Sequence, residues 1–153
     1  MNRMLASNDT VGRELTSTVT AMHWVGSHPE AALDWALTHL ELFDGSYLAS
    51  MAMWIGQSDR QLATTTIDRL PAEHRNGWIV AAATGMASRD ADIAIDWIAR
   101  FRGQPVHESA LRRIVTTIGG REPEKARQIA AQHVTNPELR RQLEAQLAPR
   151  PGR

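Results

Sequence analysis

The sequence predicts an all-α protein, a right-handed α-solenoid of about four antiparallel helical hairpins with a C-terminal capping helix. Three observations predict it: a segment that returns every 31 or 32 residues, a small residue fixed within each copy, and an amphipathic helix pattern upstream of each copy. A period of this length is typical of helical hairpins that cannot bury their apolar faces alone and do so by stacking on one another.

The recurring segment is anchored by an alanine that returns as Ala32, Ala63, Ala94 and Ala126. A methyl side chain lets two crossing helices approach closely, so we expect each copy to be the second helix of a hairpin. The copies read SHPEAALDWAL (27–37), SDRQLATTTID (58–68), RDADIAIDWIA (89–99) and REPEKARQIAA (121–131).

Upstream of each copy, apolar residues recur at the spacing i, i+3, i+4, i+7, which is the stripe of an amphipathic helix that faces a core. In the first copy, which ends in Ala21 and Trp24, Ser17 and Thr20 occupy apolar positions. We therefore expect the first hairpin to be a solvent-facing cap. The stripes of the later copies are Leu48, Met51, Ala52, Ile55, then Ile79, Ala82, Ala83, Met86, then Leu111, Ile114, Val115, Ile118.

Helix boundaries follow the same division of the chain. Pro29 and Pro123 fall in first helical turns. The candidate N-caps of the other two copies are Ser58 or Asp59, and Asp90. Asn136 opens one more helix, and we expect this helix to close the array as a lid. Residues 1–12 and 149–153 carry no periodic signal and are predicted to be flexible ends, which leaves 13–148 as a single helical-repeat domain.

Composition restricts the class of protein. The 153 residues include 42% hydrophobic residues, but no apolar run approaches the roughly 18 residues that span a bilayer, and no signal peptide is recognised. We expect a soluble, cytoplasmic protein with no membrane partner. The absence of cysteine excludes disulfides, thiolate nucleophiles and cysteine-bound metal sites.

The net charge is zero but unevenly distributed. Residues 1–76 hold five Arg against nine Asp and Glu, whereas 77–153 hold twelve Lys and Arg against eight acids. An acidic partner could be steered toward the C-terminal half, although a solvated surface of mixed charge accounts for the same residues. The arginines concerned are Arg100, Arg102, Arg112, Arg113, Arg140 and Arg141.

The hairpin pattern, the small residue of the second helix and the Pro-Glu helix starts resemble tetratricopeptide-like bacterial helical repeats over about residues 13–134. The period is shorter than the usual 34 residues and the Gly-Tyr pair is lacking, so HEAT-like and other α-solenoids stay open. The resemblance implies a concave surface for peptide or protein partners and no intrinsic catalysis.

If the first helices of the hairpins line that surface, the residues beside their buried stripes are candidates for partner binding. We select His23, Tyr47, Trp54, Trp78 and, from the basic half, Arg113. Large rigid rings contribute much of the energy of interface hot spots. The competing interpretation is that Trp54 and Trp78 pack between adjacent hairpins.

A search for catalytic patterns returns little. The six histidines form no HExxH pair or other metal-ligand spacing, Asp34 and Asp96 recur because the repeat does, and Gly119-Gly120 lacks the lysine of a phosphate loop. We predict a non-enzyme without metal or cofactor, whose partner is a protein or peptide.

The leading function is a protein-interaction scaffold, and the alternative is an accessory or assembly module of a larger enzyme complex. An unshielded end of the array could also pair with a second copy. The neutral charge disfavours a helical-repeat RNA binder.

Overall fold

The computed structural model describes residues 24–42 and 45–148, and these residues are helices and short connections without a strand. The all-α class is therefore confirmed. Most of the first helix of the first hairpin, the ends 1–12 and 149–153, and His23 lie outside the described residues. The helices are α2 (Pro29–Thr38), α3 (Gly45–Ser58), α4 (Arg60–Arg69), α5 (Ala72–Arg89), α6 (Ala91–Ile98), α7 (Pro105–Gly119), α8 (Pro123–His133) and α9 (Pro137–Leu147), with 3-10 turns η1 (Leu40–Leu42) and η2 (Ala99–Phe101).

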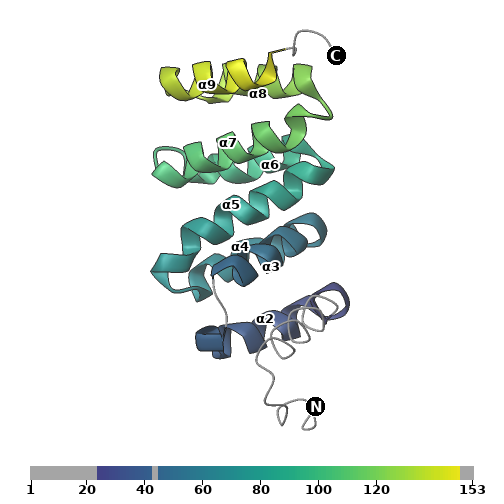
Figure 1. The fold of residues 1–153 in the computed structure, drawn as a ribbon. Helices are drawn as coiled ribbons and strands as arrows, with labels where there is room; N and C mark the ends of the chain where they lie inside the picture. The colour runs from purple at the N-terminus through teal and green to yellow at the C-terminus, as the bar shows by residue number, and fades with distance from the viewer. Residues whose placement is uncertain (1–23, 43–44, 149–153) are drawn as a thin grey trace, which may run out of the picture.

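Figure 1 shows these helices stacked in chain order from α2 to α9. Helix α3 lies against α5, α5 against α7, and α7 against α8 and α9. The shorter α4 packs on α3 and α5, and α6 packs on α5 and α7. Each of the helices α3 to α9 thus contacts helices that are close to it in the sequence.

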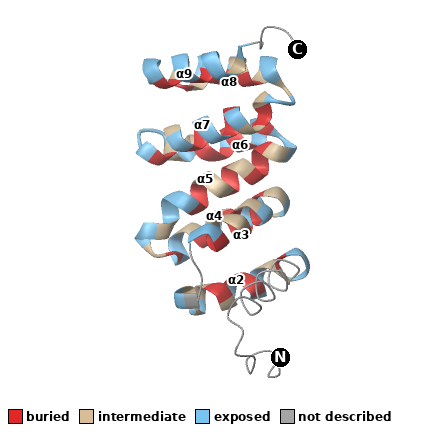
Figure 2. Cartoon of the chain, viewed as in Figure 1, coloured by how far each residue is buried: buried red, intermediate tan, exposed pale blue. Residues whose placement is uncertain are grey.

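The predicted stripes form the core. Every stripe residue named for α3, α5 and α7 is buried, and so are the anchoring alanines Ala32, Ala63, Ala94 and Ala126. Figure 2 shows the buried residues running as a band through the stack. Asp59, and not Ser58, is the N-cap of α4, since it accepts a hydrogen bond from the Leu62 amide at 2.8 Å. The predicted N-cap Asp90 is confirmed, and it accepts one from the Asp92 amide at 2.8 Å.

Helices α3 and α5 cross closely, and the crossing depends on two glycines. A Cβ added to Gly56 would stand 2.3 Å from the Ala82 carbonyl oxygen, and a Cβ added to Gly85 would stand 2.0 Å from the Met53 carbonyl oxygen. No side chain fits at either distance. The two helices therefore pack backbone against backbone, each through a glycine that faces a carbonyl of the other.

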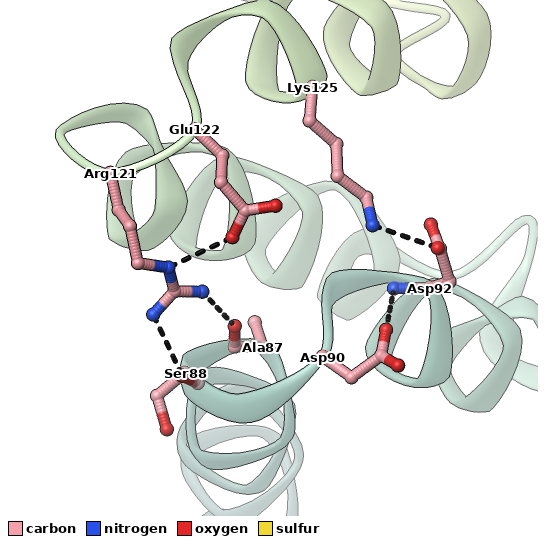
Figure 3. A network of polar contacts seen from close by, with 7 residues as sticks. All are labelled: Ala87, Ser88, Asp90, Asp92, Arg121, Glu122 and Lys125. Atoms are coloured by element: carbon pink, nitrogen blue, oxygen red, sulfur yellow. Dashed lines mark hydrogen bonds and ion pairs between the residues drawn. The ribbon is translucent and has the colours of Figure 1, made fainter.

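Polar contacts join chain positions 32 to 35 residues apart. The Arg121 guanidinium, placed just after α7, donates to the Ser88 carbonyl at 2.8 Å and to the Ala87 carbonyl at 3.3 Å, at the C-terminal end of α5 (Figure 3). Arg89 donates in the same way to the Gln57 carbonyl of α3 at 2.9 Å. These arginines satisfy carbonyls that a helix end leaves without a partner.

The helices predicted to be second in their hairpins, α4, α6 and α8, are joined by further polar contacts. Lys125 of α8 pairs with Asp92 of α6 at 2.8 Å, and that hydrogen bond raises the pKa of Lys125 (Figure 3). The Trp97 indole of α6 donates to the Thr64 hydroxyl of α4 at 2.8 Å. These two contacts tie α8 to α6 and α6 to α4, helices that lie one repeat apart.

The helix predicted to begin at Asn136 corresponds to α9, and its role as a lid stays a prediction. Its N-cap Asn136 accepts hydrogen bonds from the Glu138 and Leu139 amides at 3.0 and 3.2 Å. Leu139 and Leu143 are buried, and Leu147 lies over Gly119, where an added Cβ would meet it at 2.6 Å. The remaining residues of α9 are mostly exposed and polar (Figure 2), as is typical of an element that closes an array.

We predict that Gly85→Ala lowers the free energy of unfolding by about 1–3 kcal/mol, because the new methyl group forces α3 and α5 apart. Gly77→Ala, on the same helix, is the matched control, since nothing lies within 4 Å of its added Cβ. That change should stabilise the protein by about 0.5–1 kcal/mol through helix propensity. Urea unfolding followed by circular dichroism measures both, and equal effects would contradict the backbone contact.

We predict that a chain ending at Thr135 self-associates, because removal of α9 uncovers the apolar ends of α7 and α8 that Leu139 and Leu143 now cover. Light scattering coupled to gel filtration should give a mass above that of the full chain at equal concentration. A truncated chain with an unchanged association state would show that α9 is not a lid.

Candidate functional site

The described residues form two open grooves of similar volume. One, of about 560 Å³, is lined by residues of α7, α8 and α9. The other, of about 570 Å³, crosses several helices over the middle of the stack. It is lined by residues of α3, α5 and α7, the helices predicted to be first in their hairpins. The lining residues are Ala49, Ser50, Met53, Asn76, Gly77, Val80, Ala81, Thr84, Pro105, Val106, Ser109 and Arg113.

The floor of the groove is α5. Gly77, Val80, Ala81 and Thr84 lie at the spacing i, i+3, i+4, i+7, which places them on one face of the helix. All four are small or medium in size, and the last three are half-buried. The neighbouring helices carry longer side chains, with Met53 on α3 and Arg113 on α7. A floor of short side chains between longer ones makes the depression.

The hydroxyl groups of the groove donate within their own helices. Ser50 donates to the Ser46 carbonyl at 2.9 Å, Thr84 to the Val80 carbonyl at 2.7 Å, and Ser109 to the Pro105 carbonyl at 3.4 Å. Their protons are therefore occupied while their oxygens can still accept, so Asn76 and Arg113 are the lining side chains that can donate to a partner.

Among the described residues that line the groove, Arg113 is the one charged side chain. Arg113 is exposed, and no ion pair within residues 24–42 and 45–148 includes it. The N-terminal end of α7 also lies at the groove, as its first residues Pro105 and Val106 are part of the lining. The N-terminal end of a helix carries partial positive charge. Both features favour a negatively charged group.

His107 adds little positive charge beside them. Burial lowers the pKa of His107, and the neighbouring charge of Arg102 lowers it further. A histidine with a lowered pKa is mostly neutral at pH 7. Arg113 is therefore the group that sets the charge of the groove.

The residues predicted to bind a partner do not lie together in one accessible site. Arg113 lines the groove, whereas Trp54 is 45% exposed but lies outside it, and His23 is outside the described residues. Trp78 is 1% exposed and its indole donates to the Ala63 carbonyl at 2.9 Å. Tyr47, 31 positions earlier, is also buried, and burial raises the pKa of its phenol.

Tyr47 and Trp78 are therefore not accessible to a partner, which corrects their assignment to a binding surface. Both stand in the same register of the repeat, one that faces the core, and large rings are favoured there because they bury the most apolar area. For Trp78, the competing interpretation of packing between helices agrees with the structure.

Apart from Arg113, sequence reasoning missed the residues that line the groove. Gly77, Ala81 and Ala49 carry no functional group, and they are not among the residue types that are enriched in interface hot spots. A signal was present in the helix pattern, since Gly77, Ala81 and Thr84 place small residues on the side of α5 away from its stripe. A solvent-facing stripe of small residues next to longer neighbours is the pattern to look for.

The described residues hold no group of three or more His, Cys, Asp or Glu side chains that could bind a metal ion. No helix among them is long and apolar enough to cross a membrane. The chain matches no protein-family model, no curated protein and no solved structure.

We predict that Trp78→Ala lowers the free energy of unfolding by about 3–5 kcal/mol, because it empties a core position and leaves the Ala63 carbonyl without its indole donor. Trp54→Ala, the control at an exposed tryptophan, should cost about 1 kcal/mol or less. Chemical denaturation of both variants gives the comparison. Similar losses would mean that Trp54 is packed as tightly as Trp78.

Proposed function

We propose that the chain is an α-solenoid of about four helical hairpins that acts as a non-catalytic scaffold and holds a segment of a protein partner in the groove over α5. The 31–32-residue period supports the solenoid, because the arginine links from Arg89 and Arg121 join equivalent helix ends one period apart. Stacked hairpins with the same register create extended surfaces of this kind.

The observation that carries the proposal is the groove itself. It is lined from three helices that are spread along the chain, has an apolar floor, and offers few polar groups at defined positions. A groove that crosses helices suits an elongated segment better than a compact metabolite, and helix-lined grooves are a recurrent mode of peptide recognition.

Binding should depend on the empty space above Ala81. We predict that Ala81→Trp, which fills the floor of the groove, weakens partner binding roughly tenfold or more, while Ala131→Trp does not. Ala131 is exposed on α8 and does not line the groove, so it controls for the added ring. Both variants should unfold at the same denaturant concentration as the wild type.

The measurement is capture from a nuclease-treated extract of the organism that makes the protein, on immobilised wild type and both variants at two salt concentrations. Proteins retained by the wild type and by Ala131→Trp, but not by Ala81→Trp, are then tested as overlapping peptides. A short peptide that keeps the affinity supports the scaffold. A partner that binds all three proteins equally contradicts the groove. A partner that binds only as a folded domain, with an interface of about 800 Å² per side, favours the accessory module.

A further inference from the structure

We propose that the groove over α5 selects an acidic peptide segment, in which an Asp or Glu side chain pairs with Arg113 while small or apolar side chains beside it rest on Val80 and Ala81. This inference rests on the proposed function and adds the chemistry of the partner. It assigns Arg113 the role of a specificity residue.

Charge complementarity is the first argument. Arg113 stands in the groove without an ion-pair partner among the described residues, and no carboxylate lines the groove. Most other cations of the C-terminal half are engaged within the fold: Lys125 binds Asp92, Arg121 binds Glu122 and two carbonyls, and Arg140 donates to the Val134 carbonyl. Arg113 is free to bind a partner.

The surroundings of Arg113 strengthen such a pair. Val106, Val80 and Ala81 line the same groove, and its hydroxyl protons are occupied by helix carbonyls. A segment lying over this lining excludes water from the guanidinium, and a charge-assisted hydrogen bond gains strength as the local dielectric constant falls. A basic side chain at the same place meets a like charge and loses its hydration, so it is rejected.

The carboxylate is that of a side chain, not of a chain terminus. Terminal carboxylates are usually held by clusters of free backbone N–H groups. Every groove residue except Pro105 and Val106 lies beyond the first turn of its helix, where each N–H pairs with the carbonyl four residues back. The groove therefore offers a guanidinium and a small apolar floor, which suit an internal Asp or Glu.

The test is a selection of random 16-residue peptides displayed on phage, with their C-termini joined to the coat protein so that any acidic preference comes from side chains. The full chain is the target. Enriched sequences are made as amidated peptides, and their dissociation constants are measured by fluorescence anisotropy. The proteins compared are the wild type, Arg113→Glu, Ala81→Trp and Arg112→Glu, an exposed neighbour that does not line the groove.

We expect enrichment of Asp or Glu at one position of the selected peptides. Arg113→Glu should weaken their binding roughly tenfold or more, and Arg112→Glu by much less, on the scale of one lost charge-assisted hydrogen bond. Replacing the selected acid by Lys should restore binding to Arg113→Glu but not to the wild type. That charge exchange would identify a direct contact.

Two further results separate the inference from the proposed function. If Ala81→Trp abolishes binding but Arg113→Glu does not, or if neutral or basic peptides are selected, the groove stands and the acidic preference is overturned. If Ala81→Trp leaves binding unchanged, or no peptide is enriched, the groove is not a peptide site and both proposals fall.

Discussion

The backbone contact between α3 and α5 determines where the groove can be. Gly56 faces the Ala82 carbonyl and Gly85 faces the Met53 carbonyl, so the two helices hold each other at two points close to their C-terminal ends. Met53 takes part both in this helix contact and in the groove, because its carbonyl faces Gly85 and the residue also lines the groove. Thr84, next to Gly85, is part of the floor. Gly56 and Gly85 therefore fix where α3, which forms one side of the groove, lies relative to the floor on α5.

The arginine links extend this constraint to α7. Arg89, the last residue of α5, donates to the Gln57 carbonyl of α3, and Arg121, just after α7, donates to the Ala87 and Ser88 carbonyls of α5. All three helices that line the groove are thus joined at their C-terminal ends by a guanidinium in the same register. If the groove binds a segment as proposed, a surface supported at such points would change little in shape, and less ordering entropy would be lost on binding.

Much of the fold was predictable, because burial follows the sequence period. The stripe of α7 and the alanines of the second helices were expected in the core and are found there. Gly56 and Gly85 gave no comparable signal, since a glycine inside a helix has a meaning only once the helix opposite is known. The site was less predictable. Tyr47 and Trp78 were selected for their size, and their size is the reason that the core takes them.

Specificity in such a groove comes from the few groups that the fold leaves unsatisfied. The hydroxyls of Ser50, Thr84 and Ser109 donate to their own helices, so they add shape without a strong preference for an acceptor. Asn76 is exposed at the groove and can serve as donor or acceptor, which discriminates little. Arg113 can only donate and is always charged. Under the proposed function, a chain of zero net charge would distinguish acidic from basic segments at one point, without attracting polyanions over its whole surface.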